Sequence, residues 1–247
     1  MTVLCYHSVD PGWTSPMAVR PRDFERHCAW LARRREVVPL AEAVHRLDRS
    51  GRLPRGVAAL TFDDGFAELA EHAAPVLARF GLPGTVFLVA QTLSAGGQAV
   101  DWVDTPRASP LTTLTREQVL AMQEAGVEFQ SHSWAHLDLT RLGFEACVRD
   151  LVDSRELLSD LLHRRVSLLA YPRGRHDATV RAAAARAGYT HAFALPERGE
   201  SPGPYSIPRV GVHHGNSMAT VRVKSARHYL PLRTGAAYSL ARRLSTG

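Results

Sequence analysis

Short apolar segments alternate with segments of helical period along most of this chain. The candidate strands are residues 3–7, 57–62, 85–89, 127–132, 166–171, 191–194 and 207–212. Between them, apolar residues recur at steps of three and four, as in helices with one buried face. Strands that alternate with helices predict a parallel sheet with helices packed on it. Seven strands in one domain indicate a (β/α) barrel or a doubly wound sheet.

Helix boundaries are marked at several places. Thr115 precedes Arg-Glu-Gln, which predicts a helix whose first turn is capped by Thr115 and a glutamine at the third position. Gly81, Gly126 and Gly188 each stand where a helical pattern stops, and glycine is the residue that most often ends a helix. Residues 92–113 lack periodicity and are rich in Gly, Ser and Pro, so we expect a long loop that shapes a substrate groove.

Composition excludes several classes of protein. The 247 residues are 45% hydrophobic and 22% charged, and no apolar run is long enough to cross a bilayer. The first residues, MTVLCYHSVDP, are interpreted as a strand and not as a secretory signal, which predicts a cytoplasmic protein. Cys5, Cys28 and Cys147 lack metal-site spacing and are expected to be buried free thiols.

Charge is unevenly distributed along the chain. Residues 201–247 contain no acidic residue, although the whole chain has a net charge of only +6. We therefore expect a main domain over residues 1–220 and a basic C-terminal tail over residues 221–247. The tail is interpreted as a solvated segment, with peripheral contact to an anionic membrane or a lipid-linked substrate as the alternative. No nucleic-acid motif accompanies it, so no nucleic-acid partner is expected.

Polar residues follow four of the predicted strands. These are His7, then Asp63 and Asp64, then Ser131 and His132, and finally the segment Tyr171-Pro172-Arg173-Gly174. The carboxyl ends of parallel strands meet at one rim, where barrels and open α/β sheets place their chemistry. The sequence therefore predicts that these side chains converge on one site.

Histidines four residues apart, His132 and His136, can face the same point and offer two ligands to zinc. A catalytic zinc site needs a third protein ligand, which the Asp63-Asp64 pair can supply. Adjacent residues on a strand point to opposite faces, so one carboxylate can bind metal while the other acts as a base. Each motif alone has other uses: paired aspartates also hold magnesium with phosphates, and two histidines with a carboxylate also bind iron in oxygenases.

The motifs TFDDG (from Thr61), HSWAH (from His132) and AYPRG (from Ala170) occur in the order typical of one family. Together with LCYHSVDP at the start and GLPGTVF from Gly81, they resemble the polysaccharide deacetylase superfamily (NodB homology, carbohydrate esterase family 4). The resemblance runs from about residue 3 to residue 212. It implies a distorted (β/α) barrel of about seven parallel strands.

The resemblance also implies roles for individual residues. Asp63 would be the general base, and Asp64, His132 and His136 would bind the metal, which is zinc or else cobalt or nickel. Water would attack the carbonyl of an N-acyl group, most often acetyl, on an amino sugar. The backbone N–H near Arg173 would help to hold the oxyanion. The substrate-binding residues that we expect are His7, Trp134, Tyr171, Pro172, Arg173 and Gly174.

The chain departs from the family pattern in two places. Ala170 stands where many members carry an arginine that steadies the catalytic aspartate, and we predict that Arg209 takes that role. The late motif that supplies the general acid has no clean match. His213 is the predicted acid, with His214 and His7 as alternatives.

The expected substrate is an N-acylated saccharide in a glycan or linked to a lipid or nucleotide. Three alternatives stay open at this point: hydrolysis of another non-peptide C–N bond, as in deformylases and cyclic-ureide hydrolases; an inactive homologue that only binds glycan; and an iron oxygenase.

Overall fold

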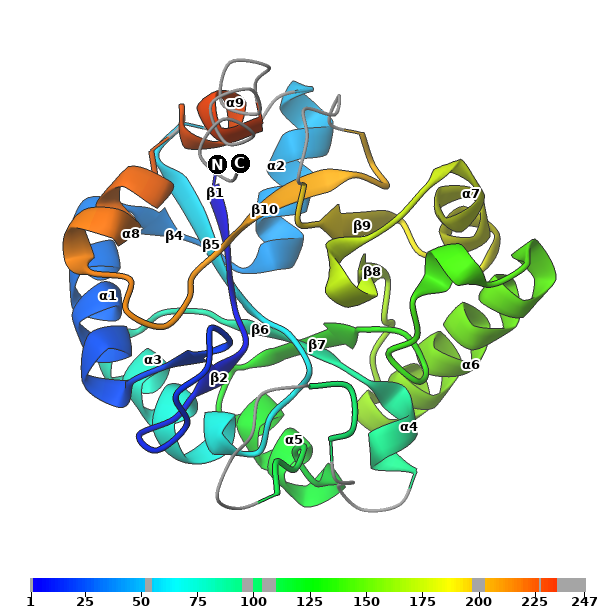
Figure 1. Ribbon diagram of the computed structural model, residues 1–247, viewed down its shortest axis with the longest axis horizontal. Helices are drawn as coiled ribbons and strands as arrows, with labels where there is room; N and C mark the ends of the chain where they lie inside the picture. Colours follow the sequence, from blue (N-terminus) through cyan, green and yellow to red (C-terminus); the bar gives the residue numbers. More distant parts are fainter. Residues whose placement is uncertain are drawn as a thin grey trace, which may run out of the picture.

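A computed structural model describes residues 2–51, 55–94, 100–103, 110–196, 203–226 and 228–234. Its main feature is a ring of parallel strands surrounded by helices (Figure 1). The strands of the ring are β1 (Thr2–Tyr6), β5 (Val57–Phe62), β6 (Thr85–Leu88), β7 (Glu128–Ser131), β8 (Leu168–Ala170), β9 (His191–Ala194) and β10 (Ile207–Gly211).

Two pairings of β1 close the ring. Val3 is in register with Arg209 of β10 on one side and with Ala59 of β5 on the other. The remaining strands follow in the order β10, β9, β8, β7, β6 and β5. Between β7 and β8 only Ser131 and Leu169 are in register, so the barrel is distorted there. The predicted barrel is therefore confirmed, and the doubly wound open sheet is wrong.

Three very short strands were not predicted. β4 (Glu36–Val37) adds to β5 outside the ring, and β2 (Ser8–Val9) pairs with β3 (Ala18–Val19) in a separate small sheet. A strand of two residues shows no alternation of apolar and polar positions, so the sequence carries no periodic signal for it.

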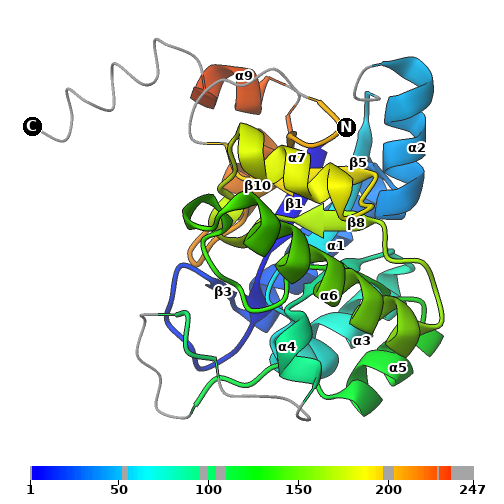
Figure 2. The same cartoon turned by 90° about the vertical axis from the view of Figure 1, so that its right-hand side faces the viewer.

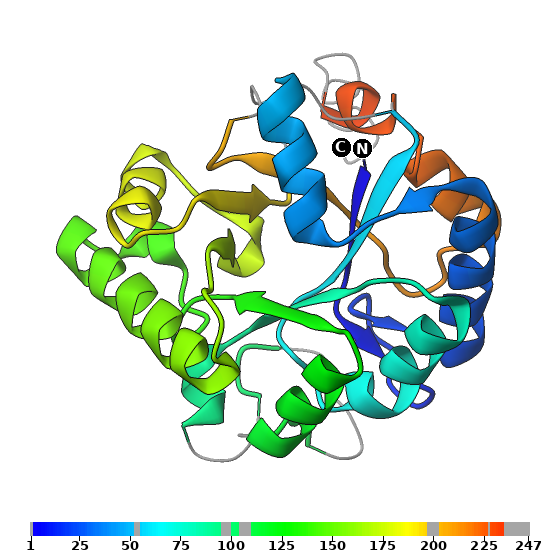
Figure 3. The same cartoon turned by 180° about the vertical axis from the view of Figure 1, so that it is seen from behind.

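Helices cover the outside of the ring (Figures 2 and 3). In the described part of the chain they are α1 (Pro21–Arg34), α2 (Leu40–Ser50), α3 (Ala74–Phe80) after a π-helical turn (Leu69–Ala73), α4 (Ala90–Leu93), α5 (Arg116–Glu124), α6 (Phe144–Leu162), α7 (Ala178–Arg186), α8 (Met218–Lys224) and α9 (Tyr229–Thr234), with 3-10 turns at Leu139–Arg141 and Pro172–Gly174. None of the helices in these residues is long and apolar enough to span a membrane.

The predicted helix boundaries are confirmed. Thr115 accepts a hydrogen bond from the backbone N–H of Gln118, whose side chain accepts one from the N–H of Thr115 in return. Gly81 ends α3 with a φ of 60°, and Gly126 and Gly188 follow α5 and α7 with φ of 94° and 90°. These left-handed conformations cost glycine little, because glycine has no Cβ to clash with the backbone.

Alternate residues of the strands belong to two different clusters. Leu4 and Tyr6 of β1 pack with the surrounding helices, whereas Val3 joins apolar side chains from β5, β6, β8, β9 and β10. The second cluster is the interior of the barrel. The buried face of α2 closes the interior at the amino ends of the strands. Cys5 lies on the same face of β1 as Val3, two residues nearer the carboxyl end, and is also buried. The interior is thus apolar at the amino ends of the strands, and its polar groups lie toward the carboxyl ends.

All three cysteines are buried and unpaired, as expected. Parts of two predictions lie outside the described residues: positions 95–99 and 104–109 of the predicted loop, and positions 227 and 235–247 of the predicted tail. The boundary proposed at residue 220 falls inside α8, where Val221 is fully buried. The division into a domain and a tail stays a prediction.

The start of β6 approaches α3 so closely that only glycine fits. A Cβ on Gly84 would lie 2.7 Å from Cδ1 of Leu77 and 3.3 Å from a ring carbon of Phe62. We expect Gly84→Ala to lower the free energy of unfolding by about 1–3 kcal/mol through overpacking. Gly12→Ala is the control, because its Cβ would meet only Asp10 Oδ1 at 3.7 Å. Urea unfolding that shifts equally for both variants would contradict this packing.

Candidate active site and metal centre

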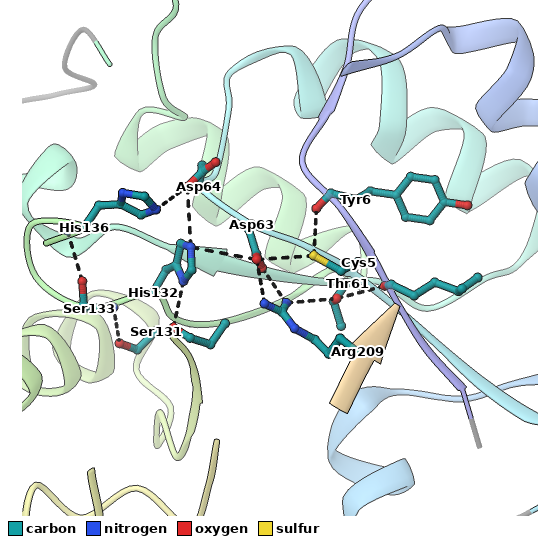
Figure 4. Close-up of polar contacts among 12 residues, drawn as sticks. Cys5, Tyr6, Thr61, Asp63, Asp64, Ser131, His132, Ser133, His136 and Arg209 are labelled. Carbon is teal, nitrogen blue, oxygen red and sulfur yellow. Dashed lines mark hydrogen bonds and ion pairs between the residues drawn. The ribbon is translucent and has the colours of Figure 1, made fainter. Parts of the chain in front are cut away.

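The two adjacent carboxylates leave β5 in different directions (Figure 4). Asp63 continues the strand, since its backbone N–H donates to the carbonyl oxygen of Tyr6 at 3.0 Å. Asp64 has a φ of 69°, in the left-handed region that is unfavourable for aspartate compared with glycine. The chain therefore turns between them. Both side chains are buried, but they reach different neighbours.

The turn after β7 carries the two histidines in a similarly unusual backbone. Ser133 and His136 have φ of 69° and 54°. The hydroxyl of Ser131 accepts a hydrogen bond from the N–H of Ser133 at 3.2 Å, and the hydroxyl of Ser133 accepts one from the N–H of His136 at 3.1 Å. Strained conformations of this kind persist only where their surroundings hold them, and they concentrate at functional sites.

The histidines and Asp64 meet at one point. Oδ1 of Asp64 lies 3.3 Å from Nε2 of His136 and 3.6 Å from Nε2 of His132. Both Asp64 oxygens are buried, and neither makes a well-formed hydrogen bond to the described residues, although the indole N–H of Trp102 lies near the carboxyl. Burial, followed by the negative charge of Asp63, raises the pKa of Asp64 to about 8. A buried carboxylate without a well-formed hydrogen bond fits a site for a cation, which would remove this cost.

The histidines present the form that a metal needs. Nδ1 of His132 lies 2.8 Å from the carbonyl oxygen of Ala170, and a carbonyl can only accept, so Nδ1 carries the hydrogen. Nε2 of His132 is left with its lone pair, on the side of Asp64. Burial lowers the pKa of both His132 and His136, which keeps the rings neutral. Two imidazoles and a carboxylate form a donor set that suits zinc.

Asp63 makes a buried ion pair with Arg209. Nη1 and Nη2 of the guanidinium donate to Oδ1 and Oδ2 of Asp63 at 2.6 and 2.7 Å. Cys5 donates its S–H to Oδ2 at 3.4 Å. Burial alone would raise the pKa of Asp63, but the charge and hydrogen bonds of Arg209 together with the neighbouring His132 and His7 hold the pKa well below its usual range. Asp63 is therefore ionised at any ordinary pH.

Arg209 is itself fully buried, and its guanidinium lies between the ring of Phe87 and the carboxylate of Asp63. Its guanidinium carbon lies 5.3 Å from the ring centroid of Phe87, at the top of the apolar interior. Nη1 also donates to the hydroxyl of Thr61 at 3.3 Å. The cation–π contact with Phe87 and the two hydrogen bonds to Asp63 fix the plane of the guanidinium. They therefore also fix the orientation of the Asp63 carboxylate.

Three of the predicted substrate-binding residues line the same cavity as the carboxylates and histidines. This cavity of about 310 Å³ is bounded by His7, Arg173 and Gly174, with Trp102 and others. A second hollow of about 700 Å³ shares Trp102, His136 and Arg173 with it. The two hollows therefore adjoin each other beside Asp64, His132 and His136.

The other predicted residues lie elsewhere. Tyr171 is buried and donates to the carbonyl oxygen of Tyr205 at 3.0 Å. Pro172 is buried in the turn before Arg173, and Trp134 packs its side chain against the core. His213 packs against Gly211, and burial, followed by the positive charge of Lys224, lowers its pKa. None of these four predicted residues lines the cavity, so the geometry gives their binding or catalytic roles no support.

Two residues of the site were missed by sequence reasoning. Trp102 stacks on His136 with ring centroids 5.0 Å apart, and it comes from the loop that was expected to shape the substrate groove, in which no single residue had been singled out. Asp150 of α6 accepts hydrogen bonds from the backbone N–H groups of Trp134, at 3.0 Å, and Ala135. Its position in the apolar pattern of α6 could have marked it as a partially buried carboxylate, but its partners depend on the fold.

Comparisons with known proteins identify the family of this chain. The family model for polysaccharide deacetylase matches residues 50–192. YxkH of Bacillus subtilis, named for the polysaccharide deacetylases, is 26% identical over 88% of this chain and 73% of its own. The poly-beta-1,6-N-acetyl-D-glucosamine N-deacetylase of Staphylococcus epidermidis is 24% identical over a segment that covers 78% of this chain and 67% of that protein. The deacetylase PplD of Streptococcus pyogenes has the same fold, with a TM-score of 0.77, 23% identity and coverage of 92% and 98%. The chain belongs to the polysaccharide deacetylase family.

Removing the guanidinium should destabilise the barrel through the charge that it leaves behind. We expect Arg209→Met to lower the free energy of unfolding by about 3–5 kcal/mol, because Asp63 would stay buried without a partner. The double variant Arg209→Met/Asp63→Asn removes both charges and should recover part of that loss. Urea unfolding in the presence of a chelator measures both. Equal losses in the single and double variants would show that the charge is not the cause.

Asp150 should support metal binding without touching the metal. We expect Asp150→Ala to weaken zinc affinity about tenfold or more, because the turn between His132 and His136 loses its anchor. Asp150→Asn keeps an acceptor oxygen and should lose less. Asp153→Ala, an exposed position on the same helix, is the control. Competition with a zinc chelator gives the affinities, and similar values for Asp150→Ala and Asp153→Ala would contradict the anchoring role.

Proposed function

We propose that this protein is a metal-dependent hydrolase that removes an N-acyl group, most often acetyl, from an amino sugar within a saccharide. One observation carries the proposal: a buried carboxylate without a well-formed hydrogen bond and two neutral histidines, Asp64, His132 and His136, converge beside a second carboxylate held ionised by Arg209. Membership of the polysaccharide deacetylase family supports it, as do relatives named for N-deacetylation of a glucosamine polymer.

The metal would be held by Asp64, His132 and His136. Zinc is the first candidate and cobalt or nickel the alternatives, since all accept imidazole and carboxylate ligands. When bound, such an ion acts as a Lewis acid toward a carbonyl oxygen and lowers the pKa of a coordinated water. Its positive charge would also stabilise the ionised form of Asp64.

Asp63 is the proposed general base. Its carboxylate is ionised and therefore able to accept a proton from the attacking water. Arg209 donates a hydrogen bond to each carboxylate oxygen of Asp63, and Cys5 donates its S–H to Oδ2. The base is thus fixed in one orientation inside the barrel, so little reorganisation is needed when the proton moves.

The proton for the leaving amine needs a second group. His7 lines the cavity, and its ring and the carboxylate of Asp63 have ligand atoms within 4.8 Å of each other. We therefore infer that His7, in preference to His213, delivers this proton; because burial lowers the pKa of His7 to about 4, the ring would first have to take up the proton that the attacking water releases. The backbone N–H near Arg173 remains the proposed oxyanion donor. Gly174 allows the close turn that follows Tyr171, since a Cβ there would lie 2.5 Å from Cβ of Leu195.

The inactive, glycan-binding alternative was motivated by Ala170. The ion pair of Arg209 with Asp63 supplies the missing positive charge from another strand, which favours an active enzyme. The saccharide could be a polymer or a lipid-linked or nucleotide-linked sugar. The cytoplasmic location and the peripheral membrane contact remain predictions.

Acetate release tests the proposed reaction. The zinc-loaded protein should release acetate from β-1,6-linked N-acetylglucosamine oligomers or from another member of a panel of N-acetylated saccharides. Asp63→Asn should lower that rate by at least about 10²-fold while zinc stays bound, because the proton acceptor is lost but the ligands are kept. Asp153→Asn is the matched control.

Undiminished turnover in Asp63→Asn would exclude Asp63 as the base. Formate or ammonia without acetate would point to the alternative C–N hydrolases. Saccharide binding without any product would favour the glycan-binding homologue.

A further inference from the structure

A second cavity lies on the outer wall of the barrel, between α1 and α8, which pack side by side (Figures 1 and 3). Its volume is about 790 Å³, and it is lined by Arg26, Ala29, Trp30, Arg33, Arg34, Arg35, Met218 and Arg222. No carboxylate of the described residues lines it. None of its lining residues belongs to the cavity around Asp63 and Asp64. Several guanidinium groups therefore share one hollow with no opposite charge.

Some exposed arginines elsewhere on the surface are paired with carboxylates. Examples are Arg20 with Asp23, Arg46 with Glu36, and Arg79 with Glu25, with nitrogen–oxygen distances of 3.1, 2.7 and 2.7 Å. Others, such as Arg149 and Arg186, make no ion pair with the described residues; the cavity differs in that several unpaired guanidinium groups share one hollow. The described residues offer no side-chain ion pair or hydrogen bond to four arginines of the cavity: Arg26, Arg33, Arg34 and Arg222. Like charges left together without partners are unfavourable unless an anion joins them.

The wall of the cavity is fixed in place by its remaining arginine. Nη2 of Arg35 donates to the carbonyl oxygen of Ser225 at 3.3 Å, which ties the end of α1 to the end of α8. The guanidinium carbon of Arg35 also lies 5.2 Å from the ring centroid of Trp30 and covers that ring. The cavity is therefore built into the packing of two helices and does not depend on one mobile side chain.

The spacing of the arginines indicates the shape of the ligand. From Arg26 to Arg34 the helix rises by roughly 12 Å at about 1.5 Å per residue, more than a single phosphate can span. Guanidinium groups bind phosphate oxygens in pairs and keep their charge at any ordinary pH. We propose that this cavity is a docking site for an extended polyanion that carries several phosphate groups.

The geometry disfavours two other occupants. A bilayer surface would use exposed apolar side chains, but Val223 and Leu232, which are 60% and 70% exposed on α8 and α9, are not part of the lining. Single-stranded nucleic acid would need a free aromatic face for stacking, and Arg35 already covers Trp30. This docking site is independent of the reaction proposed for the barrel rim, and its function would be to keep a phosphate-bearing polymer near the enzyme.

Binding of linear inorganic polyphosphate to the zinc-loaded full chain tests the proposal by titration calorimetry over a range of salt concentrations. We expect Arg33→Gln/Arg222→Gln to weaken binding about tenfold or more and to reduce the slope of log affinity against log salt by about 0.7 for each phosphate contact removed. Arg149→Gln/Arg186→Gln removes the same charge from exposed positions on α6 and α7 and should change affinity less than about twofold.

Three results would overturn the proposal. Equal weakening by the two double variants would mean that polyphosphate responds only to net charge. Orthophosphate that binds as tightly as polyphosphate would mean a site for a small anion. Binding to phosphatidylglycerol vesicles but not to polyphosphate would mean a membrane surface. Far-ultraviolet circular dichroism and an unchanged zinc content show that the variants are folded.

Discussion

Two carboxylates placed side by side inside a protein lose their hydration and repel each other, so a fold that keeps both must offer each a source of positive charge. Asp63 receives it from within the chain, through the paired hydrogen bonds of Arg209. Asp64 has no such partner among the described residues and faces the Nε2 atoms of two neutral histidines. This asymmetry is the basis of the proposed roles, in which Asp63 acts as the base and Asp64 binds a cation.

The closed barrel brings Arg209 and Asp63 together in its interior. β1 is the neighbour of both β10 and β5, so inward-facing side chains of these three strands meet in the interior. Arg209, Cys5 and Asp63 contact one another there, above an apolar layer that contains Phe87. An open sheet would leave β1 and β10 at an edge, and the guanidinium would then be hydrated and less able to hold Asp63. Closure of the ring therefore lowers the local dielectric and strengthens the ion pair.

Sequence reasoning succeeded where the signal was local. Apolar runs bounded by helical patterns identified every strand of the ring, and polar residues at their ends pointed to the rim where Asp64, His132 and His136 meet. Arg209 was anticipated because a missing arginine at Ala170 required a replacement. It failed where a contact depends on tertiary structure: the anchoring of the histidine turn by Asp150 joins residues of different elements, and Trp102 comes from an irregular segment. The choice of general acid stays a prediction: the fold shows that His7 lines the cavity and that His213 does not, which the sequence could not show.

The metal content of the purified protein is the most direct test of the site. After incubation with zinc and removal of excess metal, the wild-type chain should retain about one zinc ion per molecule, the stoichiometry of a three-ligand catalytic site. His132→Ala/His136→Ala should retain none, whereas a control with the buried His191 changed to alanine, away from the site, should retain it. Wild-type protein that binds no zinc, cobalt or nickel, or a double variant that binds as much as the wild type, would contradict the proposed metal centre and the hydrolase that depends on it.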